Sequence, residues 1–146
     1  TITCKWVFNV KHDENGKIDQ FKGHLVAKGF LQKYGIKFDE TFSPVVRFTS
    51  IRALLAFAVF RNMFIHQMDV VTAFLNGTLD EDIYMEQPEG YVVPGKENLV
   101  CHLKKSLYGL KQSPRCWNNS FKEFMISQGF TQSAASSFGK SMINSP

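Results

Sequence analysis

The amino-acid sequence predicts an α+β fold, and three features of its residue pattern support this class. Large apolar residues recur at every second position on both sides of a turn near the N-terminus, two later segments carry apolar residues at helical spacing, and short extended stretches separate these helices. The chain has 146 residues, of which 44% are hydrophobic, so it fits one domain or a piece of one. This hydrophobic content argues against general disorder.

The first predicted element is a β-hairpin. Trp6, Phe8 and Val10 recur at every second position, as in a strand with one apolar face. Residues 13–16, with the sequence Asp-Glu-Asn-Gly, then supply the positive φ angles of a tight turn. Residues 18–29 resume in extended form, and lysines are scattered along both arms. The pattern therefore predicts two antiparallel strands joined by a short turn.

A helix is predicted after a segment without a clear period. Residues 30–48 are interrupted by Gly and by Ser-Pro, and they predict a loop with short elements. Thr49 or Ser50 can then cap a helix, since the following apolar residues lie at i, i+3, i+4, i+7 and i+8. The apolar run 53–60 is far shorter than the roughly 20 residues that span a bilayer, so it predicts a buried helix. The apolar face comprises Ile51, Leu54, Leu55, Ala58 and Val59.

Short extended segments are predicted in the middle of the chain. Residues 64–70 have the composition of a strand, and Asn76-Gly77 marks a turn before a second extended stretch at residues 82–86. Proline and glycine interrupt the chain at residues 88–90 and 94–96. Residues 99–103 are then long enough for one further strand.

A second helix and a tail complete the predicted order. Ser113 and Pro114 have the N-cap and N1 pattern, and Gly129 can end the helix in a left-handed conformation with Phe130 folded back. Residues 133–146 are rich in Ser and Ala and show no period, so we expect a domain over residues 1–132 and a divergent, disordered tail. One face of the helix carries Trp117, Phe121, Phe124, Met125 and Gln128.

The net charge of +4 is unevenly distributed along the chain. Residues 1–61 hold ten Lys/Arg against five Asp/Glu, residues 62–103 hold one against seven, and residues 104–146 hold six against one. An acidic middle flanked by two basic arms suits a polyanion held around a cation-binding centre. The same charges are also compatible with an ordinary solvated surface.

The cysteines and the N-terminal sequence indicate an intracellular setting. Cys4, Cys101 and Cys116 are odd in number and form no Cys-x-x-Cys pair, which argues against a disulfide framework and a zinc ribbon. No signal peptide or membrane-spanning segment is recognisable, and the start at Thr1 suggests a missing N-terminus.

Asp69 is the first candidate for a chemical role. It follows a predicted strand where the chain turns, and a carboxylate there can bind a hard cation with help from the next carbonyl, that of Val70. An acid at this place can equally form the turn or cap a helix. The single carboxylate leaves both interpretations open.

Seven phrases of the sequence carry a family resemblance: Lys5-Trp6-Val7-Phe8, Leu25-Val26-Ala27-Lys28-Gly29-Phe30, Asp39-Glu40-Thr41-Phe42-Ser43-Pro44-Val45-Val46-Arg47, His66-Gln67-Met68-Asp69-Val70, Ala73-Phe74-Leu75-Asn76-Gly77, Ile83-Tyr84-Met85-Glu86-Gln87-Pro88-Glu89-Gly90, and residues 103–115 from Leu103 to Arg115. In order and spacing, these phrases resemble copia-type retrotransposon reverse transcriptases (Pseudoviridae). The resemblance runs from about the first residue to about Gln132, which makes chance similarity negligible.

The resemblance implies part of a right-hand polymerase fold, with a fingers β-hairpin and an incomplete palm built from an antiparallel sheet and two main helices. It implies a template-primer of RNA or DNA and a deoxynucleoside triphosphate as partners. Asp69 matches the first catalytic aspartate, which with the Val70 carbonyl binds Mg²⁺ or Mn²⁺ for two-metal nucleotidyl transfer. Phe74 matches the aromatic gate against the sugar 2′ position, although it could simply be a core phenylalanine.

Further nucleotide contacts follow from the same resemblance. Tyr108, Gly109 and Lys111 match a motif that contacts the incoming nucleotide, and the template-positioning residues Ser113 and Pro114 follow it. Without the family, this segment is a plain junction between a loop and a helix. In the fingers, Lys22 and His24 match triphosphate contacts. Most relatives carry Arg in place of His24 and Ala in place of Gly23. Because imidazole lacks the guanidinium fork, we expect either weaker nucleotide binding or a phosphate contact made by Lys22 and Lys28. Without the family, His24 is simply a strand residue.

The family's Tyr-x-Asp-Asp motif has no counterpart, since no Asp or Glu follows Glu123. The remaining palm, the thumb and the ribonuclease H segment are likewise expected to be missing. We therefore expect a fragment of an RNA-directed DNA polymerase that is inactive by itself and does not bind the metal stably. The alternative is a decayed, non-catalytic remnant with at most weak nucleic-acid binding.

Overall fold

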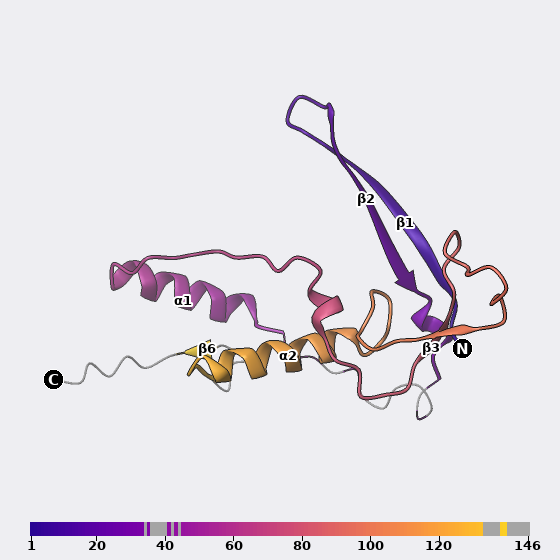
Figure 1. Ribbon diagram of the computed structural model, residues 1–146. Coiled ribbons are helices and arrows are strands. Elements are labelled where there is room, and N and C mark those ends of the chain that lie inside the picture. The colour runs from indigo at the N-terminus through magenta and orange to yellow at the C-terminus, as the bar shows by residue number, and fades with distance from the viewer. Residues whose placement is uncertain (34, 36–40, 42, 44, 133–137, 140–146) are drawn as a thin grey trace.

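The computed structural model describes residues 1–33, 35, 41, 43, 45–132 and 138–139 (Figure 1). Within this part of the chain the strands pair as separate antiparallel two-stranded sheets, β1 with β2, β3 with β4 and β5 with β6, which confirms the α+β class. In chain order the elements are β1 (Cys4–His12), β2 (Ile18–Ala27), the 3-10 helix η1 (Gly29–Leu31), α1 (Phe48–Phe60), the 3-10 helix η2 (Ala73–Asn76), β3 (Tyr84–Glu86), β4 (Val100–His102), α2 (Ser113–Ser127), β5 (Thr131–Gln132) and β6 (Phe138–Gly139).

The predicted hairpin is confirmed and extends away from the rest of the chain (Figure 1). Its strands pair from Cys4 opposite Ala27, at the base, to the turn at residues 13–16. Asp13 organises this turn, because its carboxylate accepts hydrogen bonds from the backbone N–H groups of Asn15 and Lys17, each at 2.8 Å. The side chain therefore closes the tip of the hairpin locally, without contacts from distant residues.

A small core lies at the base of the hairpin, where segments distant in the sequence meet. Ile2 joins β3 as a parallel neighbour, since its N–H donates to the carbonyl of Tyr84 and its carbonyl accepts from the N–H of Glu86, both at 2.9 Å. The pairing of β3 with β4 continues this arrangement. The buried side chains of the core belong to Ile2, Ala27, Ile83, Met85 and Leu110.

Two glycines allow the backbone after the hairpin to touch the loop before α2. A Cβ atom on Gly29 would lie 1.9 Å from the carbonyl oxygen of Gly109, and one on Gly109 would lie 2.1 Å from the carbonyl oxygen of Ala27. Gly109 also has a φ of +91°, which disfavours other residues. The N–H of Ala27 donates to the carbonyl of Tyr108 at 2.7 Å, so the backbones of the two segments are also joined directly.

Helix α2 is confirmed, but its first turn differs from the prediction. Gln112 occupies the N-cap position, but its side chain does not cap the helix, and the hydroxyl of Ser113 donates to the carbonyl of Leu107 at 2.6 Å instead of capping it. The predicted C-terminus is confirmed. Gly129 has a φ of +78°, and the N–H of Phe130 donates to the carbonyl of Met125, as in a Schellman motif.

Helix α1 exists as predicted, yet its cap and its burial were predicted wrongly. The N-cap residue is Arg47, so Thr49 and Ser50 lie inside the first turn. No residue of α1 is buried, and the side chains of the predicted apolar face remain largely exposed. An apolar face specifies only which side of a helix can be buried, and burial itself requires a second surface. The described residues pack no such surface onto α1.

The strand expected at residues 64–70 is also absent, and this part of the chain is irregular. Strand conformation is stabilised by a hydrogen-bonded neighbour, and none is present here among the described residues. The other expectations for the middle of the chain are met. Residues 84–86 and 100–102 form β3 and β4, and the N–H of Gly77 donates to the carbonyl of Phe74 in the expected turn.

Some sequence-based predictions lie outside the described residues. Residues 36–40, 42 and 44 belong to this group, and with them most of the phrase beginning at Asp39. So do residues 133–137 and 140–146 of the predicted tail, of which β6 alone is described. The tail boundary therefore stays a prediction. In the described segments, no helix is both long and apolar enough to cross a membrane.

The contact between the two glycines makes a prediction for stability. We expect Gly29→Ala to lower the free energy of unfolding by more than about 3 kcal/mol, because the new methyl group would overlap a backbone oxygen that cannot rotate away. Gly16→Ala is the control: nothing lies within 4 Å of its added Cβ, so its positive φ alone should cost about 1 kcal/mol. Urea unfolding followed by circular dichroism measures both, and equal midpoints would contradict the contact.

Candidate functional site

Three of the predicted nucleotide-binding residues meet through their rings. Tyr108 makes an edge-to-face contact with Phe74, with ring centroids 5.1 Å apart, and another with His24 at 5.4 Å. Phe74 comes from η2, His24 from β2 and Tyr108 from the loop before α2. Such contacts stabilise aromatic pairs beyond the area that they bury. The structure thus gathers three distant segments into one aromatic surface.

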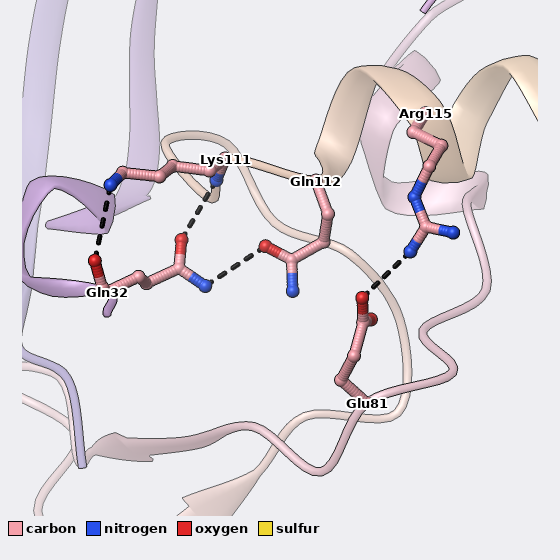
Figure 2. A network of polar contacts seen from close by, with 5 residues as sticks. All are labelled: Gln32, Glu81, Lys111, Gln112 and Arg115. Carbon is pink, nitrogen blue, oxygen red and sulfur yellow. Dashed lines mark hydrogen bonds and ion pairs between the residues drawn. The ribbon is translucent and has the colours of Figure 1, made fainter. Parts of the chain in front are cut away.

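Lys111 lies in a polar network that joins the hairpin exit to the start of α2 (Figure 2). The side-chain oxygen of Gln32 accepts the backbone N–H of Lys111 at 2.9 Å, and its backbone oxygen accepts the Lys111 ammonium at 3.2 Å. The Gln32 amide then donates to the side-chain oxygen of Gln112 at 3.0 Å. The network therefore fixes Lys111 beside the hairpin exit.

The first turn of α2 is fixed by polar groups that point into the protein. Arg115 pairs with Glu81 at 2.8 Å, and both side chains are largely buried (Figure 2). Glu81 Oε2 and Arg115 Nε are buried without a partner, so the pair is incompletely satisfied. Ser113 is buried and its hydroxyl is engaged with Leu107, while Pro114 is half-buried. Ser113 is therefore buried beneath the site and supports it by holding the Leu107 carbonyl.

The backbone of Phe74 is held in place by the segment before Tyr108. The hydroxyl of Ser106 donates to the carbonyl of Phe74, and the N–H of Ser106 donates to the carbonyl of Gly77 at 2.8 Å. A Cβ on Gly77 would lie 2.8 Å from the backbone nitrogen of Trp117, so η2 sits directly against α2. The backbone from which the Phe74 ring projects is thus fixed from two sides.

Asp69 and Val70 lie on the exposed, irregular stretch that leads into this cluster. Thr72 follows with φ 55° and ψ 40°, a left-handed conformation that is strained for a β-branched residue. In the part of the chain that the structure describes, no three His, Cys, Asp or Glu residues are grouped so that they could hold a metal ion. Asp69 is accessible to a cation, and further ligands would have to come from other residues.

Lys22 and His24 share a face of the hairpin, since they are two positions apart on β2. His24 turns its ring to Tyr108, and Lys22, opposite Asn9, lies nearer the tip. The structure therefore brings His24 to the aromatic surface and leaves Lys22 farther along the strand.

The cysteine beside this site has no features of a nucleophile. Burial raises the pKa of the Cys116 thiol, and the neighbouring Arg115 charge opposes that shift only in part. Burial likewise raises the pKa of Cys4, with the nearby Cys101 and Glu86 adding to it. Both thiols are therefore neutral at physiological pH and act in packing.

Sequence reasoning missed the polar residues that hold the site together. Gln32, Gln112 and Glu81 carry no local signal, because their partners are separated from them by 80, 80 and 34 positions respectively. Gln112 and Arg115 both lie in the phrase of residues 103–115 that carries the family resemblance, and this is the one hint that the sequence offers.

Comparison with known proteins identifies the family. The family described as reverse transcriptase (RNA-dependent DNA polymerase) matches residues 1–140. The chain belongs to this reverse transcriptase family. The chain is 56% identical, over 129 residues that make up 88% of it, to the retrovirus-related Pol polyprotein from transposon TNT 1-94 of Nicotiana tabacum. These matches confirm the resemblance to the copia type.

More distant relatives agree with this assignment. The chain is 45% identical over 134 residues, 92% of its length, to the retrovirus-related Pol polyprotein from transposon RE1 of Arabidopsis thaliana. It is 31% identical over 127 residues, 87% of its length, to the transposon Ty1-DR4 Gag-Pol polyprotein of Saccharomyces cerevisiae. The reverse transcriptase chain spans only 10%, 9% and 7% of these three polyproteins. No solved structure matches it.

The Gln32 network makes a second prediction. We expect Gln32→Leu to lower the free energy of unfolding by about 1–3 kcal/mol, because it leaves the Lys111 N–H and the Gln112 carboxamide with fewer partners in a buried place. Gln20→Leu, at an exposed position of β2, is the matched control and should change little. Urea unfolding tests both proteins, and a Gln32→Leu protein as stable as the control would show that the network contributes nothing.

Proposed function

We propose that this chain supplies the fingers and the front of the palm of an RNA-directed DNA polymerase of a copia-type retrotransposon. The hairpin of β1 and β2 corresponds to the fingers, and the segment from η2 to α2 to the palm. The observation that carries the proposal is the meeting of Phe74, His24 and Tyr108 from three separate segments. These residues were singled out from the sequence without knowledge of their contacts.

Asp69 is proposed as the first metal ligand of the complete polymerase, together with the backbone carbonyl of Val70. Its exposed carboxylate suits a hard divalent cation, Mg²⁺ or Mn²⁺, which prefers oxygen ligands. Such ions, when bound, activate the primer hydroxyl and neutralise charge on the departing pyrophosphate. The other carboxylates would come from elsewhere in the polyprotein, because none of the described residues completes a group of three around this position.

Phe74 is proposed to select deoxynucleotides by excluding a 2′ hydroxyl from the space next to its ring. A steric gate works only if the ring cannot retreat. The Ser106 hydroxyl holds the backbone carbonyl of Phe74, and Tyr108 packs edge-on against the ring, so a shift of the backbone would break the first contact and rotation of the ring the second. Gly109, with no side chain, lets the adjoining backbone approach a ligand closely.

The triphosphate is proposed to bind near Lys22 and Lys111, with His24 contributing shape more than charge. The Lys111 ammonium lies just before α2, bonded to the backbone oxygen of Gln32, and Lys22 lies on the same hairpin face as His24. His24 packs against Tyr108, and imidazole cannot offer two parallel donors as guanidinium does. Ser113 and Pro114 would position the template through the start of α2.

A chimera tests this proposal. Residues 1–132 would replace the matching segment in the reverse transcriptase of the tobacco TNT 1-94 polyprotein, to which the chain is 56% identical. We expect primer extension on an RNA template with Mg²⁺, and a loss of at least about a thousandfold in Asp69→Asn, because each metal-centred contribution stabilises the transition state by several kcal/mol. Asp82→Asn, at another exposed acid, is the control.

The isolated 146-residue chain should show no primer extension in the same assay. A chimera that folds but is inactive would favour the alternative of a non-catalytic remnant, and extension by the isolated chain that survives Asp69→Asn would overturn the proposed metal role.

Nucleic-acid binding should depend steeply on salt, because the basic arms contact phosphates. We expect log K for a single-stranded oligonucleotide to fall with log salt at a slope of about 0.7 per phosphate contacted. Lys22→Gln should lower this slope by about one contact, whereas Lys96→Gln, in the acidic middle of the chain, should leave it unchanged. Fluorescence anisotropy at several salt concentrations measures the slope, and an affinity that ignores salt would refute the phosphate contacts.

A further inference from the structure

An ion pair joins the first turn of α2 to the segment between η2 and β3. Nη2 of Arg115, in α2, lies 2.8 Å from Oε1 of Glu81, in that segment (Figure 2). The two side chains are only 18% and 19% exposed, so the contact is largely shielded from water. A buried ion pair often adds little net stability, because the cost of desolvation offsets the attraction. Its directional geometry is then its more useful property.

This ion pair uses only half of its hydrogen-bonding capacity. Glu81 Oε2 and Arg115 Nε are both buried and both lack a partner. Nε and Nη2 lie on one edge of the planar guanidinium, so the unpaired atoms are the ones that a bidentate contact with the carboxylate would join. Rotation of either side chain could add this second hydrogen bond and satisfy both atoms at once. The pair therefore has an open arrangement with one bond and a closed arrangement with two.

The segment that carries Glu81 leads directly back to Phe74. The 3-10 helix η2, which contains Phe74, packs on α2. Gly77 follows it and lies against the same helix, since an added Cβ would be 2.8 Å from the backbone nitrogen of Trp117. The contact of Glu81 with Arg115 holds the far end of this stretch on α2. The backbone position of Phe74 thus depends on how closely residues 77–81 are drawn onto the first turn of α2.

The start of α2 is also connected to the hairpin, through Gln112. This residue lies three positions before Arg115, and its side-chain oxygen accepts the amide of Gln32 at 3.0 Å (Figure 2). The start of α2 is therefore linked both to the exit of the hairpin and to the stretch after Phe74. A displacement of this turn by a bound ligand would act directly on the contact between Arg115 and Glu81.

We propose that Arg115 is a positioning residue for the Phe74 ring: its contact with Glu81 closes from one hydrogen bond to two when template and nucleotide occupy the start of α2. The closed pair draws residues 77–81 against the helix and so keeps the ring from yielding to a 2′ hydroxyl. This inference rests on the proposed function, because it requires the Phe74 ring to face the sugar of the nucleotide. It adds a residue that touches neither substrate nor metal and that acts on the choice between sugars.

The test uses Arg115→Lys in the chimera with the tobacco polyprotein. Lysine keeps the charge and the single hydrogen bond, but an ammonium cannot provide the planar fork. We expect the preference for deoxynucleotides over ribonucleotides, measured as a ratio of kcat/KM values, to fall at least about fivefold, while kcat for deoxynucleotides changes less than about twofold. Glu81→Asp, which keeps the charge but shortens the reach, should have the same effect. Arg52→Lys, at an exposed position of α1, is the control.

Two further measurements separate positioning from stability. In a chimera that carries Phe74→Val, Arg115→Lys should cause no further loss of preference, because the ring that it positions is gone. Urea unfolding of the full 146-residue chain should give Arg115→Lys a midpoint close to that of the wild type, since the one bond present in the free chain is retained. Circular dichroism checks the fold of each variant.

The other outcomes decide against the inference. An active chimera whose preference is unchanged in both Arg115→Lys and Glu81→Asp would overturn the positioning role and leave the proposed function standing. A wild-type chimera that is inactive, or that accepts both sugars equally, would count against the proposed function itself and against this inference with it. A further loss in the Phe74→Val background would show that Arg115 does not act through the ring. Loss of the fold in both variants would assign the ion pair to stability alone.

Discussion

The structure depends on the contact between the end of the hairpin and the loop before α2. Gly29 and Gly109 bring two backbones together where no side chain would fit, and Gln32 adds three hydrogen bonds around that contact. The core contacts of the hairpin also lie at its base, next to this junction, and so its angle to α2 is set here. This junction therefore sets the position of every proposed nucleotide contact on the hairpin. A small rotation of the hairpin about its base would displace Lys22 most, because Lys22 lies farthest from the junction.

The loop of residues 106–113 is fastened on several sides at once. Ser106 holds η2, Tyr108 meets both Phe74 and His24, and the Ser113 hydroxyl closes the loop on the Leu107 carbonyl. A loop that has its polar groups satisfied by the protein has little entropy to lose when a ligand binds. The residues of the phrase 103–115 therefore form a rigid support as well as a set of proposed ligand contacts.

The sequence predicted the elements whose causes are local. The hairpin turn follows from Asp13 and Gly16, and the end of α2 from Gly129, since each involves neighbours within a few positions. Burial of α1 and a strand at residues 64–70 were wrong, because both require a partner surface that a local pattern cannot specify. The Gln32 network was missed for the same reason: its partners are 80 positions away. The residues of the candidate site could be named from resemblance, but their contacts could not.

The proposed active site has two halves, and only one of them is held together by contacts between the described residues. The nucleotide side, around Phe74 and Tyr108, is built from contacts between described residues. The metal side is not, because Asp69 lies on an exposed stretch next to α1, whose apolar face is uncovered. Exposed apolar area of this extent is unfavourable in water and marks a surface that a partner can cover. The stretch with Asp69 follows α1 directly in the chain, so a partner that covers this helix would approach the metal side of the proposed site.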